Sequence, residues 1–251
     1  MREPTIAVVG AGVVGTHVAK QFGGLVWATY DVDPLRNDST QNDVNACDAA
    51  FVCVPSPMGC PRLAVDEVFR WLRTPLVVIR STVPVGTTDD LQRNYRGDVV
   101  YQPEYYGESV GHRQDWDFSV LGGLPTGLRA ATALWLRVVP PDHRFYYCTP
   151  REAEMAKYAE NCYHALKVGF VSELHDACES AGLCFERVRE AWLADPRVGR
   201  DHSAWIEPGG FGGKCLPKDL RNFLAQYPQL ALLAALDAEN QRRRPECYPG
   251  A

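Results

Sequence analysis

Residues 5–31 read TIAVVGAGVVGTHVAKQFGGLVWATYD: a strand-length apolar run, a glycine-rich turn, a helix-like stretch and a second apolar run that ends at an aspartate. Glycines in such a turn let the backbone approach a pyrophosphate, and the N-terminus of the following helix supplies N–H donors and positive potential. An acidic side chain at the end of the second strand accepts hydrogen bonds from the adenosine ribose hydroxyls, which favours NAD over NADP. The pattern therefore predicts NAD binding by Gly10, Gly12, Val13, Val14, Gly15 and Asp31.

The same rhythm continues through the first part of the chain. Strand-sized apolar runs at residues 25–30, 50–54, 76–79 and 99–101 alternate with helix-like stretches such as 13–22 and 65–72. Runs that are apolar at nearly every position are typical of strands buried on both faces of a parallel sheet. Strands that alternate with helices form βαβ units. The sequence predicts an α/β fold, with a Rossmann-type doubly wound parallel sheet over residues 1–148.

From residue 149 the pattern becomes helical. Thr149-Pro150-Arg151-Glu152 is a capping box with proline at the first helical position, and apolar residues then recur at helical spacing until Gly182. This predicts one helix of about 30 residues, about 45 Å long, followed by shorter helices around 185–193, 218–226 and 229–243. We expect an all-α central domain over residues 149–251. The apolar surface of the long helix needs a partner, so we also expect a homodimer.

Composition excludes several classes of protein. The 251 residues carry 26 Lys+Arg and 31 Asp+Glu, a net charge of −5, whereas a general nucleic-acid binder usually carries a basic face. No apolar run approaches the roughly 18 residues of a membrane helix, and the first residues do not resemble a signal peptide. The nine cysteines are scattered without CxxC pairs, which predicts neither a disulfide framework nor a metal site. We expect a cytoplasmic protein.

One cysteine lies in a setting that the other eight lack. Residues 208–219 read PGGFGGKCLPKD, and four glycines around a phenylalanine form neither a helix nor a regular strand. Cys215 directly precedes a predicted helix and lies beside two lysines, and both features favour the thiolate. We predict that Cys215 is a nucleophile, and Asp219, one turn on, can face the same space. The permissive backbone lets a substrate approach closely at Phe211, Gly212 and Gly213.

A second candidate lies on the long predicted helix. Lys157 and Asn161 are four residues apart and therefore share a face. A solvated polar stripe would show the same spacing, so periodicity alone leaves both interpretations open.

Seven segments, in order along the chain, resemble the nucleotide-sugar dehydrogenase family, which includes UDP-glucose and GDP-mannose dehydrogenases. They are residues 10–15, 54–57, 81–88, 103–108, 154–161, 195–199 and 209–219. The resemblance implies oxidation of a primary alcohol, on a nucleotide sugar or another nucleotide-linked compound, to a carboxylate with two NAD per turnover. Cys215 would attack the intermediate aldehyde, and the thiohemiacetal would then be oxidised to a thioester that water hydrolyses.

The resemblance also implies roles for individual residues. Lys157 and Asn161 would stabilise the developing oxyanion. Glu104 and Asp219 would act as general acid/base groups, and Thr82 would order an active-site water. Arg197 would reach substrate across the dimer. The cofactor would also contact Val54, Pro55, Ser81, Thr82 and Glu108.

Two departures from the family pattern concern length. Only 22 residues separate Asp31 from Val54, where the family has a longer excursion. The sequence also ends shortly after Arg244, where the family continues into a third domain that grips the nucleotide of the substrate. We therefore expect a trimmed form that lacks the C-terminal nucleotide-sugar-binding domain. A partner subunit that supplies nucleotide binding is one alternative.

Two other functions remain open on sequence alone. A one-step dehydrogenase of the β-hydroxyacid or 6-phosphogluconate type also pairs a dinucleotide domain with a helical domain and carries Lys-x-x-x-Asn, but it needs no cysteine in a GGxC loop. The third hypothesis is a non-catalytic NAD-binding subunit. The presence of a complete set of candidate catalytic residues argues against it: Glu104, Lys157, Asn161, Cys215 and Asp219.

Overall fold

The computed structural model describes residues 2–105 and 117–248, and the chain divides into two compact units, Met1–Lys157 and Tyr158–Ala251. The division falls inside a long helix, α6 (Pro150–Ser180), and not at residue 148, where the sequence pattern changes. The reason is that the first turns of α6 pack with the first unit: Ala153 is fully buried in the core beneath the sheet.

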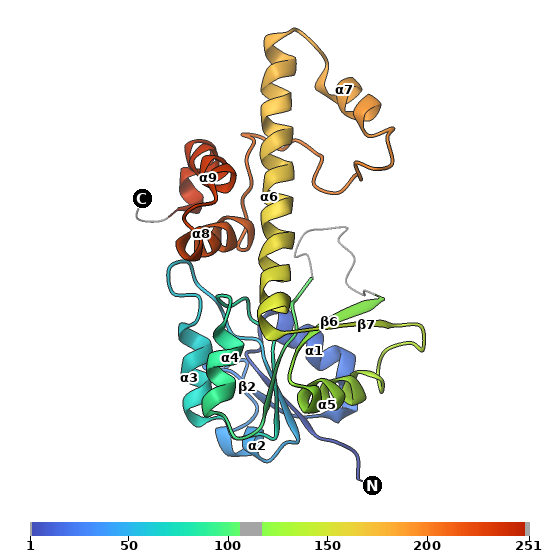
Figure 1. Cartoon of the computed structure of the whole chain (residues 1–251), viewed down its shortest axis with the longest axis vertical. Coiled ribbons are helices and arrows are strands. Elements are labelled where there is room, and N and C mark those ends of the chain that lie inside the picture. The colour runs from blue at the N-terminus through green and yellow to red at the C-terminus, as the bar shows by residue number, and fades with distance from the viewer. Residues whose placement is uncertain (1, 106–116, 249–251) are drawn as a thin grey trace. The chain divides into compact units, whose positions relative to one another are not determined.

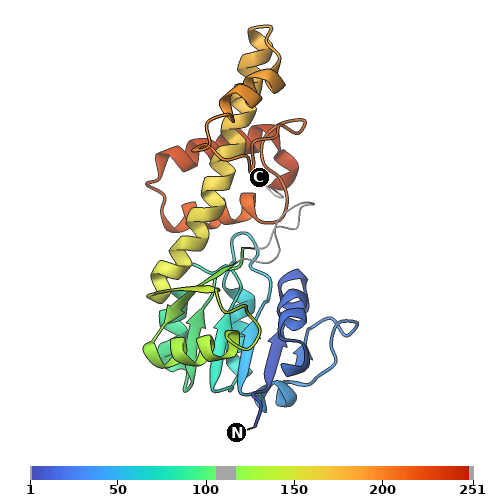
Figure 2. The ribbon, with the colours of Figure 1, turned by 90° about the vertical axis from the view of Figure 1, so that its right-hand side faces the viewer.

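The first unit is built on a sheet whose seven described strands lie in the order β2-β1-β3-β4-β5-β6-β7 (Figures 1 and 2). Neighbouring strands are parallel except β5 and β6, which are antiparallel. This confirms the doubly wound α/β fold and adds an antiparallel step. The strands are β1 (Ile6–Val9), β2 (Val26–Tyr30), β3 (Ala49–Val52), β4 (Leu76–Ile79), β5 (Asp98–Tyr101), β6 (Phe118–Gly123) and β7 (Arg144–Cys148).

Helices cover both faces of this sheet. On one face, α1 and α5 bury apolar side chains such as Val18 and Trp135. On the other face, α2, α3 and α4 contribute residues such as Val44, Val65 and Leu91. The apolar runs of the strands therefore face a hydrophobic core on each side, as a doubly wound sheet requires. The helices are α1 (Val13–Phe22), α2 (Gln41–Asn45), α3 (Leu63–Trp71), α4 (Thr87–Asn94) and α5 (Pro125–Trp135).

Helix α6 begins at the capping box that the sequence predicts. Thr149 Oγ1 and the Thr149 backbone N–H both donate to the Glu152 carboxylate, and the Glu152 N–H donates back to Thr149 Oγ1. At the other end, Gly182 has φ of 66°, a left-handed conformation that suits a glycine after a helix.

The second unit contains the rest of α6 together with α7 (Phe185–Trp192), α8 (Leu216–Gln226) and α9 (Ala231–Arg243) (Figure 1). Part of its apolar core lies between α6 and α7, where Val171, Cys178 and Phe185 are buried against Trp192 and Trp205. Within the described residues, no helix combines the length and the apolar character needed to cross a membrane.

Candidate active site

The glycine-rich turn in the first unit has a backbone that larger residues would block. A Cβ at Gly10, where φ is 94°, would lie 2.7 Å from the Cys53 carbonyl oxygen, and a Cβ at Gly15 would lie 1.8 Å from the Gly10 oxygen. By contrast, no described atom lies within 4 Å of the Cβ position at Gly12, which caps α1. The turn is therefore closed toward β3 and open at the N-terminus of α1, the side from which a pyrophosphate would approach.

Asp31, at the end of β2, is hydrogen-bonded to this turn. Its Oδ2 accepts from the Ala11 N–H at 2.7 Å, and its Oδ1 accepts from the Asp33 N–H at 2.9 Å. Each carboxylate oxygen can accept a second hydrogen bond, so the fixed carboxylate retains capacity for ribose hydroxyls. Together with the opening at Gly12, this donor and acceptor arrangement fits a dinucleotide.

Ser81, one of the residues expected to contact the cofactor, links the ends of β3 and β4. Ser81 is buried, and its Oγ donates to the Val54 carbonyl at 2.7 Å. Thr82, the next residue, is half-buried, and Pro55 is exposed. Glu108, the other residue expected here, lies outside the described residues.

Glu104 follows β5 and forms a buried ion pair. Arg80 donates through Nη2 to Glu104 Oε2 at 2.8 Å, and its guanidinium also lies 5.7 Å from the centre of the Trp135 ring. The nearby Cys53 thiol stays protonated, since burial raises its pKa to about 12. Arg80 was not among the residues expected at the site. Its position directly before the 81–88 segment, at the end of a buried strand, is the sequence signal that could have found it.

Lys157 and Asn161 are both buried, which excludes the solvated-stripe interpretation for these two residues. The Lys157 ammonium lies 5.3 Å from the centre of the Tyr105 ring, a cation–π distance. One turn earlier, Glu154 is fully buried and accepts from the Thr88 N–H (2.8 Å) and Oγ1 (2.7 Å) and from the Gly86 N–H. These bonds attach the start of α6 to the N-terminus of α4.

In the second unit, Asp219 is buried in the first turn of α8. Its Oδ2 accepts from Asn161 Nδ2 and its Oδ1 accepts from Lys218 Nζ, both at 2.5 Å. Cys162, beside Asn161, is not a candidate nucleophile, because burial and, to a smaller extent, the Asp219 charge raise its pKa to about 12. The structure thus brings together two of the residues that the sequence singled out, Asn161 and Asp219, and adds Lys218 as a charged partner.

Cys215 is exposed and caps the N-terminus of α8, where its carbonyl accepts from the Asp219 N–H at 2.8 Å. In the preceding loop, Phe211 is only 2% exposed, so its side chain is buried. Gly213 has φ of 78°, and no described atom lies within 4 Å of its Cβ position. The open part of the loop is therefore next to Cys215.

Arg197, the remaining residue from the sequence analysis, lies in the connection between α7 and α8. Its side chain is 88% exposed and forms an ion pair with Asp195 at 2.6 Å. The Arg197 side chain therefore lies on the surface of the second unit.

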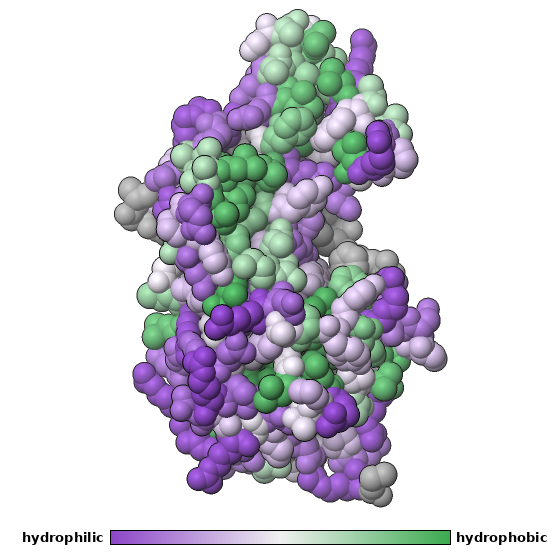
Figure 3. Space-filling view, viewed as in Figure 1, coloured by the Kyte–Doolittle hydropathy of each residue, from purple (hydrophilic) through white to green (hydrophobic). Residues whose placement is uncertain are grey.

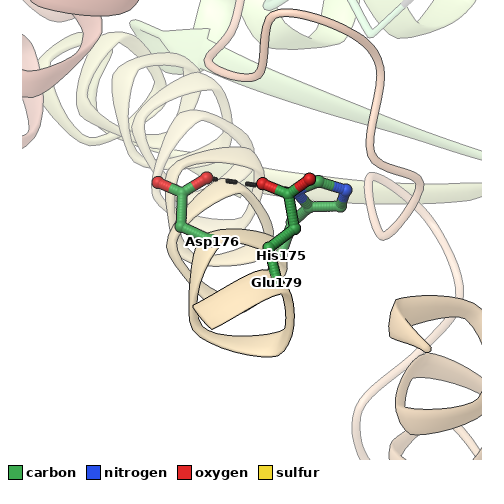
Figure 4. Close-up of side chains that lie close together, drawn as sticks. All are labelled: His175, Asp176 and Glu179. Carbon is green, nitrogen blue, oxygen red and sulfur yellow. Dashed lines mark ion pairs between the residues drawn. The ribbon is translucent and has the colours of Figure 1, made fainter. Parts of the chain in front are cut away.

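One group of described side chains has the spacing of metal ligands: His175, Asp176 and Glu179, all on α6 (Figure 4). Asp176 forms an ion pair with Arg243, and this hydrogen bond lowers the pKa of Asp176. The His175 ring stacks on Trp205 with 3.8 Å between ring centres. Because arginine already neutralises one carboxylate and the imidazole is packed on an indole, we assign no metal role to this group.

The chain is similar to known proteins in both sequence and fold. Residues 151–242 match the model of the UDP-glucose/GDP-mannose dehydrogenase family, central domain. A UDP-glucose 6-dehydrogenase of Pseudomonas aeruginosa is 31% identical in an alignment 228 residues long, which covers 78% of this chain and 49% of that protein. The chain thus spans about half the length of the curated relatives that it matches.

Solved structures show the same fold. A UDP-glucose dehydrogenase from the hyperthermophilic archaeon Pyrobaculum islandicum is 27% identical and superposes with a TM-score of 0.83 over 98% of this chain and 68% of that chain. A 3-hydroxyisobutyrate dehydrogenase from Mycobacterium tuberculosis shares the fold at 16% identity, with a TM-score of 0.72 over 98% of this chain and 95% of that chain. The expected resemblance is confirmed: residues 151–242 match the central domain of the UDP-glucose/GDP-mannose dehydrogenase family, and the chain as a whole is similar to nucleotide-sugar dehydrogenases in sequence and fold.

Proposed function

We propose that this chain oxidises a primary alcohol, on a nucleotide sugar or another nucleotide-linked compound, to a carboxylate with NAD as the oxidant. The observation that carries the proposal is an exposed cysteine, Cys215, at the N-terminus of α8, one turn before a buried Asp219 that is bonded to Asn161. A one-step dehydrogenase has no use for such a thiol. The names of the relatives, UDP-glucose 6-dehydrogenases, support the same substrate class.

The cofactor would be held by the open turn at Gly12, by Asp31 and by the segments at Val54 and Ser81. Bound NAD supplies the hydride acceptor for each of the two oxidations. The second unit supplies the covalent chemistry. The Cys215 thiolate would add to the aldehyde carbon and form a C–S bond, while the carbonyl electron pair moves to the oxygen, which takes up a proton. The thiohemiacetal would become a thioester by losing this hydroxyl proton together with a hydride. Water then attacks the thioester carbon, the C–S bond breaks with its electron pair on sulfur, and the carboxylate is released.

The other residues stabilise charge and move protons. Lys157 and Asn161 would donate to the oxygen that becomes negative when the thiolate adds. Glu104, held by Arg80, and Asp219, held by Asn161 and Lys218, would serve as proton acceptors or donors for the alcohol and for water. Thr82 would order that water.

We further propose a homodimer through α6. Tyr163 and Phe170 are 59% and 49% exposed and lie seven residues apart, on one face of the helix. Figure 3 shows hydrophobic side chains gathered along α6 in the second unit. Exposed Arg197 would then be free to reach a neighbouring subunit. Sedimentation at micromolar concentration should give a dimer that Tyr163→Glu with Phe170→Glu dissociates, and a monomeric wild type would contradict it.

We assign the protein to a reducing compartment, the cytoplasm. All nine cysteines lie at described positions, and none forms a disulfide. Disulfides form and persist in oxidising compartments, so a chain with this many cysteines outside disulfides suits a reducing one.

The second candidate is a one-step β-hydroxyacid dehydrogenase, which would use the buried Lys157 and Asn161 but would not need Cys215. A screen of NAD reduction over nucleotide sugars, other nucleotide-linked alcohols and β-hydroxyacids separates the two. Two NADH per molecule of product, with a carboxylic acid as the product, supports our proposal. One NADH per product with a β-hydroxyacid supports the alternative. NAD binding without turnover of any alcohol points to a non-catalytic subunit.

A further inference from the structure

Asn240, on α9, bonds through both ends of its amide to the loop that carries Cys215. It is only 2% exposed. Its Oδ1 accepts from the Phe211 N–H at 2.7 Å, and its Nδ2 donates both to the Phe211 carbonyl and to the Tyr248 hydroxyl at 2.9 Å. The amide therefore pairs with both backbone groups of one residue, as a neighbouring β-strand would.

Only a primary amide can make this pair of bonds. Asparagine presents a donor and an acceptor side by side, whereas aspartate would direct an oxygen at the Phe211 carbonyl and repel it. Leucine has a similar shape but would leave the buried N–H and C=O of Phe211 without partners.

The loop is shaped to meet this side chain. Gly210 has φ of 70°, and a Cβ there would lie 2.6 Å from Asn240 Oδ1. The Gly210 N–H donates to Ser172 Oγ on α6 at 2.7 Å, and the Gly209 carbonyl accepts from Arg244 Nε at 2.8 Å. Residues 209–211 are thus held by side chains from α6, from α9 and from the residue after α9.

Beyond Phe211 the loop continues through Gly212 and Gly213 to Cys215. The Cβ position of Gly212 lies 3.7 Å from Cys247 Sγ, and that of Gly213 is open. Beyond Cys215, Asp219 is held by Asn161. Cys215 therefore lies between two fixed points, Phe211 on one side and Asp219 on the other.

We propose that Asn240 is a positioning residue: by fixing Phe211 it sets the conformation of residues 209–215 and with it the reactivity of the Cys215 thiol. The inference rests on the proposed function for the role of Cys215 as nucleophile. A thiol at a helix N-terminus gains reactivity from being held there. A loop released at Phe211 holds Cys215 in that place for a smaller fraction of the time.

The test measures alkylation of individual cysteines by iodoacetamide, with peptide mass spectrometry, in the full chain. Asn240→Asp and Asn240→Leu break the contact from the helix side, and Gly210→Ala breaks it from the loop side. Cys60 and Cys184 are exposed and serve as internal controls in each sample. Asn94→Asp, the same chemical change at an exposed position on α4, is the matched control variant.

We expect slower alkylation of Cys215 in all three variants, with unchanged rates at Cys60 and Cys184 and no effect of Asn94→Asp. A Cys215 rate equal to or above that of the wild type overturns the proposal. If a variant unfolds, so that buried cysteines also react, Ser172→Ala replaces it. This change releases the Gly210 N–H and otherwise removes only the bond from Ser172 Oγ to the Val168 carbonyl of its own helix.

A kinetic readout separates positioning from a merely structural role. With an alcohol that the wild type oxidises, Asn240→Asp should lower kcat/KM by about tenfold or more, since small misplacements of a reacting group carry large costs. The Kd for NAD should not change, because the glycine-rich turn at Gly12 belongs to the first unit and Asn240 to the second. Alkylation needs no turnover, so its result stands even if no alcohol is oxidised, the outcome that would refute the proposed function.

Discussion

The Arg80 guanidinium donates to the Glu104 carboxylate at 2.8 Å, and both side chains are almost fully buried. The pair joins the end of β4 to the chain just after β5, so it fixes one candidate catalytic group relative to the sheet. Each partner depends on the other, because a charge left alone in such a place cannot be solvated.

Arg80→Met should therefore lower the free energy of unfolding by about 3–5 kcal/mol, whereas the double variant Arg80→Met/Glu104→Met should recover much of that loss. Urea denaturation measures both. Arg93→Met breaks an exposed pair with Asp90 and should cost less than about 1 kcal/mol. Equal losses for the two arginines would mean that the Arg80 pair is not effectively buried.

Cys215→Ser should leave NAD binding intact, because the cofactor turn lies in the other unit. It should abolish steady formation of the acid, since a serine hydroxyl is a poor nucleophile at its free pKa. Titration with NAD and analysis of the product check the two statements. Cys184→Ser, which changes an exposed thiol at the N-terminus of α7 in the same unit, is the control. Full acid production by Cys215→Ser would favour the one-step alternative.

Asp31→Asn should reduce the preference for NAD over NADP by about tenfold, a free-energy difference of about 1.4 kcal/mol. The amide can still accept from the Ala11 N–H but no longer repels a 2′-phosphate. Fluorescence titration with both cofactors measures the ratio. Asp33→Asn, two residues on, is the matched control. A wild type that binds NADP as tightly as NAD would refute the role of Asp31.

Glu154 should make stability depend on pH. Burial raises its pKa above the ordinary 4.5, although Thr88 and Gly86 donate to the carboxylate. The folded protein then holds the proton more tightly than the unfolded chain, so this contribution is present below about pH 4.5 and is lost as pH rises through the raised pKa. The free energy of unfolding of the wild type, relative to Glu154→Gln, should therefore fall as pH rises.

Glu152→Gln is a control of opposite sign on the same helix. Hydrogen bonds from the Thr149 backbone and side chain lower the pKa of Glu152, so its contribution is lost as pH falls. Relative to this variant, the wild type should gain stability as pH rises. Parallel pH curves for the two glutamine variants would contradict both assignments.

Elements with a strong apolar pattern were predictable from the sequence. The runs at 76–79 and 13–22 coincide with β4 and α1, and the long helix ends at Ser180, two residues before Gly182, where the sequence predicts its end. Helix α4, with the sequence TTDDLQRN, and the edge strand β7, with exposed tyrosines, were not singled out, because polar or exposed segments carry no clear apolar period.

The candidate site also contains residues that the sequence indicates and residues that it does not. The position of Cys215 at the start of a helix followed from the local sequence, since proline and glycine mark helix boundaries within a few residues. Asn240 did not, because it lies 29 residues from Phe211 and nothing in its own neighbourhood indicates the contact. Partners that meet only through tertiary packing leave no local spacing to recognise.

Helix α6 holds both ends of the segment that carries Cys215, residues 210–219. Asn161 and Ser172 hold Asp219 and Gly210, near the two ends of that segment, and they are eleven residues apart on α6. Eleven residues are close to three full turns, about 16 Å along the axis, so both side chains leave the helix in nearly the same direction. Insertion or deletion of one residue between them would turn one anchor by about 100° and detach one end of the loop. Substitutions can therefore accumulate on α6 between Asn161 and Ser172, but insertions and deletions cannot. The number of residues in this part of α6 must match the number between Gly210 and Asp219.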